Sequence, residues 1–88
     1  MASQTVIIMD PAGMHARPAS KVAHFAANYD EDIHLTYKER TIDAKSIMGL
    51  MSLGVPKDAE LTISAEGDNA EDIVTAIVGE MRNLGLIA

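Results

Sequence analysis

The chain has 88 residues, 48% of them hydrophobic and 23% charged, which is the composition of one small globular domain spanning residues 1–88. Thirteen acidic against seven basic residues give a formal charge of −6, the wrong sign for direct binding to nucleic acid or an anionic membrane. The absence of cysteine excludes disulfides and thiolate metal sites and is typical of the cytoplasm, where we expect the protein to act. Its apolar runs are too short for membrane insertion, and Met1–Gln4 does not resemble a signal peptide.

The first third of the chain predicts a strand followed by a helix. Thr5–Met9 is an apolar, largely β-branched run, and the turn residues Asp10–Gly13 end it. Pro18 suits the third position of a helix, because its missing N–H would have no carbonyl partner there. The helix should therefore begin at or just after His15, with an apolar stripe made of Ala19, Val22, Ala23, Ala26 and Tyr29.

The remainder predicts three more strands and two more helices. Alternating apolar residues favour a strand over 33–37, and Lys38-Glu39 forms a turn into a strand over 40–43, although the usual Gly or Asn is missing. A short helix over 47–53 should have Ser46 as N-cap and end at Gly54. A fourth strand covers 61–65. Asp68 with Glu71 resembles the capping box of a last helix, which carries the stripe Ile73, Ile77, Met81 and Leu84 and ends at Gly85.

The element order is therefore β-α-β-β-α-β-α. Four strands with one apolar face each, and two long amphipathic helices, can bury their apolar surfaces as an open two-layer α+β sandwich. The β-α-β start suggests a split crossover, in which another strand lies between the first two. We expect helices on one face of the sheet and solvent on the other.

Residues 13–18 carry the most chemical information. Gly13 permits a tight turn into a helix, and His15 falls at the helix start, where free N–H groups and the dipole create positive surroundings. Arg17 adds a cation whose fork geometry suits phosphate oxygens. These surroundings favour a neutral, nucleophilic imidazole that could carry a phosphoryl group. The alternative is that His15 only caps the helix and Arg17 is a solvated charge.

The segment Gly13-Met14-His15-Ala16-Arg17-Pro18-Ala19 closely resembles the active-site motif of the HPr family, the histidine-containing phosphocarriers of the bacterial sugar phosphotransferase system. Residues 45–54, from Lys45 to Gly54, resemble that family's second signature, and the likeness extends over essentially the whole chain. It implies the HPr-type open-faced β-sandwich, with a four-stranded antiparallel sheet covered on one face by three helices. Gly13, Ala16, Pro18 and Gly54 would shape the backbone.

The resemblance also implies roles and partners. His15 would accept a phosphoryl group on Nδ1 from enzyme I and pass it to sugar-specific enzyme II components of type A, with Arg17 contacting that group. Such a protein is a stoichiometric carrier and not an enzyme, and it needs no cofactor. We expect it to be a monomer.

Ser46 has two readings. As a plain N-cap it needs no further role. By resemblance, Lys45-Ser46-Ile47-Met48 is similar to the regulatory phosphorylation site of HPr from low-GC Gram-positive bacteria. There an HPr kinase/phosphorylase modifies the serine, and the modified protein binds the catabolite control protein.

The short helix suggests a docking surface. The spacing of Ile47, Leu50, Met51 and Leu53 allows them to be buried, whereas Met48 faces outward and Gly49 allows close approach. The expected docking residues are Ser20, Ile47, Met48, Gly49 and Met51, and Met51 is shared between core and surface. Lys21 could join Ser20 at the rim, although solvated positions are the simpler interpretation of both.

His24 and His34 are expected to be solvated, and the spacing of the three histidines matches no metal site. Two alternatives to the carrier remain. One is an HPr-like regulator of catabolite repression that does not transfer phosphoryl groups, which the presence of His15 disfavours. The other is a small hydrolase, for which the sequence offers neither paired acid and base residues nor a pocket.

Overall fold

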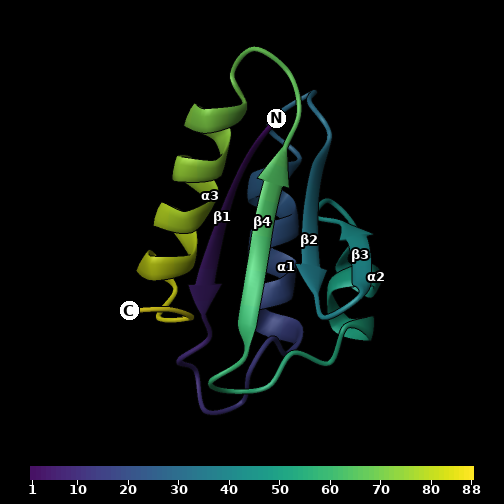
Figure 1. The fold of residues 1–88 in the computed structure, drawn as a ribbon. Coiled ribbons are helices and arrows are strands. Elements are labelled where there is room, and N and C mark those ends of the chain that lie inside the picture. Colours follow the sequence, from purple (N-terminus) through teal and green to yellow (C-terminus); the bar gives the residue numbers. More distant parts are fainter.

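The computed structural model describes residues 1–88 and contains four strands and three helices in the predicted order. The strands are β1 (Ala2–Ile7), β2 (Ile33–Tyr37), β3 (Arg40–Asp43) and β4 (Glu60–Ala65). The helices are α1 (Ala16–Ala26), α2 (Ile47–Ser52) and α3 (Ala70–Asn83). The sheet order is β1-β4-β2-β3, and every neighbouring pair is antiparallel. Strand β4 thus lies between the two strands that α1 joins, as predicted (Figure 1).

The two faces of the sheet differ in chemistry. Side chains of β2 and β4 that point toward the helices are fully buried, among them Leu35 and Ile63. On the other face the Thr5 and Thr62 hydroxyls are 2.9 Å apart, and those of Thr36 and Thr41 are 2.8 Å apart. These threonines are cross-strand neighbours, so the open face carries polar side chains that are hydrogen-bonded between adjacent strands. The predicted layering is confirmed.

Strand β1 is displaced from its predicted position. It covers Ala2–Ile7 instead of Thr5–Met9, because its partner β4 begins at Glu60, opposite Ile7. Beyond that point Ile8 only bridges to Ile87, near the end of the chain. The polar start of β1 was missed because it forms the sheet edge, where burial on one face is incomplete and the hydropathy signal is weak.

Helices α1 and α2 begin where predicted. Helix α1 starts at Ala16, which places Pro18 third, and ends at Ala26, so Tyr29 lies beyond it and packs half-buried against the core. Helix α2 starts after Ser46 and ends at Ser52, with Leu53 as its C-cap. The Arg40 guanidinium of β3 donates to the carbonyl of Ser52 at 2.7 Å, which satisfies an orphan acceptor at the end of this short helix.

The predicted capping box of α3 is wrong. Asn69 is the N-cap and makes no side-chain cap hydrogen bond, while Asp68 lies one residue too early. Gly67, with φ +96°, turns the chain so that its carbonyl accepts the N–H of Ala70 at 3.2 Å. Backbone geometry therefore replaces the side-chain cap. The acidic first turn, Glu71 and Asp72, is as predicted.

The segment after α3 completes the core. Gly85 has φ +74° and turns the chain away from the helix, as its position predicted. Leu86 is fully buried, and its carbonyl accepts the N–H of Met9 at 2.7 Å. The last residues thus hold the end of β1 just before the loop that leads to His15. No helix is both long enough and apolar enough to cross a bilayer.

Candidate functional site

His15 lies at the N-cap of α1, at the end of the loop that follows β1. Its side chain is 34% exposed and makes no cap hydrogen bond to the helix. Gly13, with φ +67°, sets the approach, because a Cβ there would overlap the carbonyl oxygen of Val55. That same oxygen accepts the N–H of Met14 at 2.9 Å. The turn at Gly13 therefore fixes His15 against the segment that follows α2.

The start of α1 presents donors to solvent. The first helical hydrogen bond runs from the Ala19 N–H to the His15 carbonyl at 3.0 Å, and Pro18 has no N–H. The N–H groups of Ala16 and Arg17 therefore remain outside the helical hydrogen bonds, at the positive end of the helix dipole. The Arg17 side chain is exposed, has no ion-pair or hydrogen-bond partner, and lines a small indentation with Pro18, Lys21 and Leu84. This arrangement can bind an anion such as a phosphate.

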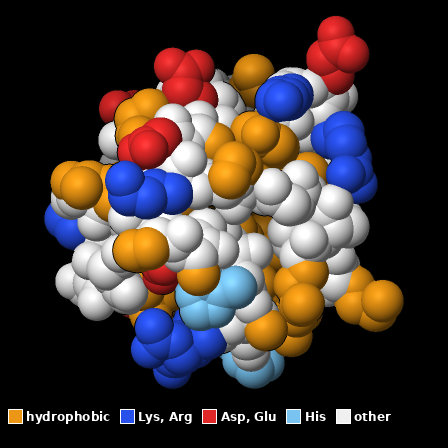
Figure 2. Space-filling view, turned by 90° about the horizontal axis from the view of Figure 1, so that it is seen from below, with side chains coloured by type: hydrophobic (Ala, Val, Ile, Leu, Met, Phe, Trp, Pro, Cys, Tyr) orange, Lys and Arg blue, Asp and Glu red, His pale blue; other side chains and the backbone are white.

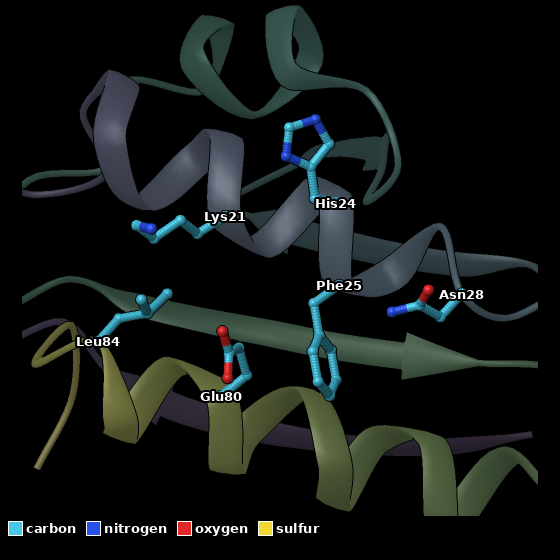
Figure 3. Close-up of a pocket in the computed structure, with 6 residues that line it drawn as sticks. All are labelled: Lys21, His24, Phe25, Asn28, Glu80 and Leu84. Atoms are coloured by element: carbon cyan, nitrogen blue, oxygen red, sulfur yellow. The ribbon is translucent and has the colours of Figure 1, made fainter.

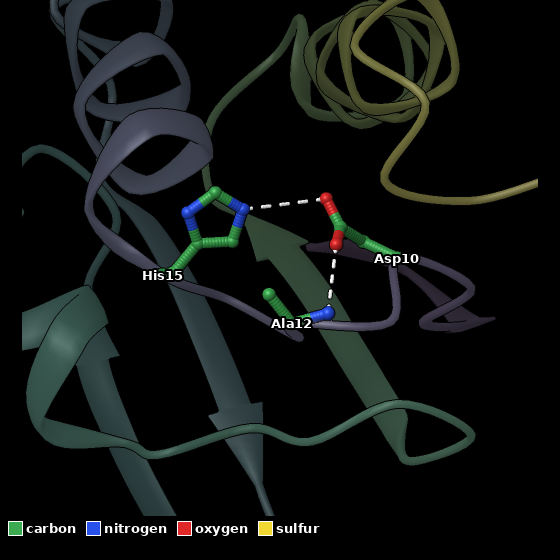
Figure 4. Close-up of polar contacts among 3 residues, drawn as sticks. All are labelled: Asp10, Ala12 and His15. Carbon is green, nitrogen blue, oxygen red and sulfur yellow. Dashed lines mark hydrogen bonds and ion pairs between the residues drawn. The ribbon is translucent and has the colours of Figure 1, made fainter.

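Asp10 is a neighbour of His15 that the sequence analysis assigned only to a turn. Its Oδ1 accepts the N–H of Ala12 at 2.9 Å, and its Oδ2 lies 3.4 Å from Nε2 of His15 (Figure 4). The expectation of purely positive surroundings is therefore wrong, because the ring lies between a helix N-terminus and a carboxylate. An Asp two residues before a loop N–H is typical of an Asx turn, and this signal could have placed its carboxylate inside the loop.

The pKa of the Asp10 carboxyl is lowered from its ordinary value. The main cause is the hydrogen bond from the Ala12 backbone N–H, which stabilises the charged form. Partial burial acts in the opposite direction, while the hydrogen bond to His15 and the positive charges of His15 and Arg17 lower the pKa further. The Asp10 side chain is thus ionised near neutral pH.

Ser46 occupies the N-cap of α2, as predicted. Its Oγ accepts the N–H of Gly49 at 3.0 Å. A Cβ on Gly49 would lie 3.2 Å from that Oγ and 3.4 Å from Cβ of Ile42. The close approach that Gly49 permits is therefore inside the protein, to Ser46 and β3, and not only to a partner.

Two methionines of α2 lie on the surface. Met48 is 82% exposed, as expected, and Met51, which the sequence assigned to both core and surface, is 47% exposed. Leu50 and Leu53 are buried, and Ile47 is half-buried against the core. Leu50 and Leu53 therefore form the buried side of this segment, and Met51 lies at its surface.

The His15 loop lies near the C-terminal end of α2. Helix α2 packs against α1, and the hydrogen bond from Met14 to Val55 joins the His15 loop to the chain just after α2. Ser46 lies at the other end of α2. The structure therefore brings His15, Arg17 and the end of α2 into one region, with Ser46 a helix length away. Gly54, with φ +61°, ends α2 in open space.

The other candidate residues lie farther along α1 or on the sheet. Ser20 is half-buried in the second turn of α1. His24 is exposed and lines an open groove between α1 and α3, together with Lys21, Phe25, Asn28, Glu80 and Leu84 (Figure 3). His34 is half-buried on the open face of the sheet, opposite Asp43, and so is less solvated than expected. No three potential metal-binding side chains come together.

The end of the molecule that carries the β1–α1 loop is an open surface. Seen from this end, histidine side chains lie in the open beside lysine or arginine and hydrophobic side chains, with no deep cleft over them (Figure 2). Such a surface suits contact with another protein better than enclosure of a small molecule.

Comparison with known proteins places this geometry in a family. A family model described as PTS HPr component phosphorylation site matches residues 2–83. The histidine-containing phosphocarrier protein of Mycoplasma is 36% identical, with 98% of each chain covered and a TM-score of 0.94. The phosphocarrier protein HPr of Bacillus anthracis is 33% identical over 90% of this chain and 94% of that one, with a TM-score of 0.82.

A third similar structure is CRH, the catabolite repression protein of Bacillus subtilis, described as a swapped, intertwined dimer. It is 31% identical over 94% of this chain and 95% of that one, with a TM-score of 0.73. The family match covers nearly the whole chain, and the solved structures share both its fold and about a third of its sequence. The chain therefore belongs to the HPr family of PTS phosphocarriers.

Proposed function

We propose that this chain is a stoichiometric carrier that accepts a phosphoryl group on Nδ1 of His15 from phosphorylated enzyme I. It then donates the group to enzyme II components of type A. The observation that carries the proposal is the placement of His15, half-exposed at the start of α1 with a ring that is not used as a cap. Because the partners supply the other half of each transfer, the protein is a covalent intermediate carrier and not an enzyme by itself.

The surroundings of His15 support moderate stabilisation of a bound phosphoryl group. The amides of Ala16 and Arg17 and the exposed Arg17 guanidinium can donate to its oxygens. A carrier must also release the group, so a few exposed donors suit it better than a closed, strongly binding pocket. The open surface leaves room for a partner's nucleophile to reach the phosphorus in line with the bond that breaks.

The exposed side chains of α2 support a docking role. Met48 and Met51 are adaptable apolar groups on the surface, and the end of α2 lies next to the His15 loop. We propose that partners contact a docking set made of Ser20, Ile47, Met48, Gly49 and Met51. The protein would act as one domain over residues 1–88, as a monomer in the cytoplasm.

Ser46 is the proposed regulatory site. Ser46 is half-buried at the α2 N-cap, where the helix end favours negative charge. An HPr kinase/phosphorylase would phosphorylate it with ATP, and the phosphorylated protein would bind the catabolite control protein. A phosphate beside Met48 would also weaken docking to enzyme I.

A second candidate function is regulation of catabolite repression without phosphoryl transfer. The similarity to CRH favours it. The presence of His15, with Arg17 and free amides beside it, favours the carrier instead.

Incubation with phosphoenolpyruvate and enzyme I, followed by intact mass spectrometry, tests the carrier. We expect a gain of one phosphoryl group that mild acid removes, as a phosphohistidine requires. His15→Ala should abolish the gain, whereas the matched changes His24→Ala and His34→Ala should leave it intact. Labelling that survives His15→Ala would refute the assignment, and an unlabelled wild type would favour the regulator.

A further inference from the structure

The Asp10 carboxylate connects the loop backbone to the His15 ring. Its Oδ1 is held by the Ala12 N–H at 2.9 Å, and the Gly13 N–H donates to the Asp10 main-chain carbonyl at 2.9 Å. With these two contacts the carboxylate orientation is fixed by the loop, and Oδ2 faces Nε2 of His15 at 3.4 Å (Figure 4). The Asp10 side chain is only 16% exposed, which limits the competition from water.

An ionised carboxylate can accept a hydrogen bond but cannot donate one. The ring nitrogen that faces Oδ2 must therefore carry the proton for the contact to be favourable. In a neutral imidazole the proton on Nε2 leaves a lone pair on Nδ1, which points away from Asp10 (Figure 4). At 3.4 Å the hydrogen bond is long, so it can shorten when the ring becomes positively charged.

We propose that Asp10 is a positioning residue that holds His15 with Nε2 protonated, and so makes Nδ1 the nucleophile and later the leaving atom. The tautomer of His15 is a property of the free protein, whereas the role of Nδ1 as nucleophile and leaving atom rests on the proposed carrier function. In the transfer, the Nδ1 lone pair forms the bond to phosphorus while the donor's bond to phosphorus breaks, its electron pair staying on the donor.

The ring then carries a positive charge that is spread over both nitrogens. The Asp10 carboxylate faces the Nε2–H group and so lies close to that charge. In the second transfer the acceptor's nucleophile forms a bond to phosphorus while the N–P bond breaks. The electron pair of that bond returns to Nδ1, and the ring becomes neutral with Nε2 still protonated. No proton has to enter or leave. Arg17 is the other charged group that acts on Asp10, and it favours the ionised carboxylate on which this depends.

The variant Asp10→Asn tests the proposal sharply. The amide oxygen can keep the hydrogen bond from Ala12, which turns the NH2 group toward Nε2. A donor in that place favours an unprotonated Nε2 and therefore moves the proton to Nδ1. Asp43→Asn is the matched control, because Asp43 accepts the N–H of Lys45 at 2.9 Å in the same two-residue geometry, on a different loop.

Two measurements are needed, on intact protein at neutral pH. The 15N chemical shifts of the ring report the tautomer, and we expect Nε2–H in the wild type and in Asp43→Asn, with a shift toward Nδ1–H in Asp10→Asn. The rate of phosphorylation by phosphoenolpyruvate and enzyme I should fall at least about tenfold in Asp10→Asn alone. In serine proteases a wrong tautomer costs about 10⁴ in rate, and the longer, partly exposed contact here should cost less.

A wild-type ring with Nδ1–H, or an Asp10→Asn variant with unchanged tautomer and rate, would overturn the role of Asp10 while the carrier function stands. A wild type that shows Nε2–H but accepts no phosphoryl group would refute the carrier and leave the orientation of His15 by Asp10 in place. An equal loss of rate in both Asn variants would mean that the loss of one negative charge, and not the contact with His15, slows the reaction. That result would also overturn the proposal.

Discussion

The N-termini of α1 and α2 are both preceded by a polar residue in extended conformation, yet the two residues use their side chains differently. Ser46 accepts the N–H of Gly49 and so satisfies one orphan donor of its own helix. His15 makes no such bond, and its ring faces Asp10 instead. Folding alone explains Ser46. It does not explain a histidine that leaves the amides of its helix free for another acceptor.

Removal of Arg17 should produce the largest change short of losing His15. Its guanidinium has no partner within the chain, so Arg17→Ala should change the free energy of unfolding by less than about 0.5 kcal/mol. Exchange of the phosphoryl group with enzyme I should slow about 10²-fold, because a donor to developing charge is lost. Arg82→Ala removes the same charge elsewhere and serves as the control. A large fall in stability with unchanged transfer per folded molecule would make Arg17 structural.

Substitutions at two glycines can separate the energetic cost of backbone strain from the cost of a steric clash. Gly13 and Gly54 have φ of +67° and +61°, but only at Gly13 would a Cβ meet another group, the Val55 carbonyl. Gly54→Ala should therefore cost about 1–2 kcal/mol of strain, and Gly13→Ala a further 1–3 kcal/mol of overpacking. Urea unfolding of both variants measures the difference. Equal costs would mean that the Val55 contact does not hold the His15 loop.

The fold could be predicted because local patterns and global burial agree. Alternation marked β2 and β4, and Pro18 and Ser46 marked two helix starts. The shift of β1 was hidden, since its register is set by where β4 begins, at Glu60, which pairs with Ile7 from the distant start of the chain. The backbone turn at Gly67 likewise replaced a side-chain cap that local sequence favoured.

The positions of the candidate site residues in the fold could be predicted, but not the groups that lie beside them. The sequence placed His15 and Arg17 at a helix start, because both follow directly from a local motif. It did not place Asp10 against the ring, because that contact depends on how the loop curls around the Ala12 N–H and on the anchor from Met14 to Val55. The sequence left Met51 between core and surface for a similar reason, because the capacity of the core beneath α2 depends on the whole fold.

Stability measurements can sharpen the contrast between the two N-caps. Ser46→Ala should destabilise the protein by about 1 kcal/mol, since Gly49 loses its acceptor. His15→Ala should change stability by less than about 0.5 kcal/mol, because no cap bond is lost and the 3.4 Å contact with Asp10 is long and partly exposed.

Ser46→Asp keeps an acceptor and adds a charge that a helix N-terminus favours, so its stability should equal or exceed that of the wild type. The same variant should slow phosphorylation of His15 mainly through a higher KM for this protein. Equal kinetics would leave Ser46 as a structural cap alone.

The smallest expected effect is in the acid dependence of stability. Hydrogen bonding from the Ala12 N–H, with the further contributions of His15 and Arg17, outweighs partial burial and lowers the pKa of Asp10 in the folded protein. The folded state therefore prefers the ionised carboxylate more than the unfolded state does. Its contribution is complete above the unfolded pKa, about 3.9, and it is lost as the pH falls through the lower folded value.

Asp10→Asn cannot ionise, so it should lack this contribution at every pH. Thermal unfolding of wild type and Asp10→Asn should differ most above the unfolded pKa of Asp10 and converge as the pH falls through the lowered pKa of the folded protein. Asp43→Asn removes the same charge from a similar turn. It therefore shows how much of any change in stability comes only from the lower net negative charge of the protein. A gap between wild type and Asp10→Asn that stays constant or widens toward acid would mean that the Ala12 and His15 contacts do not stabilise the charged form of Asp10.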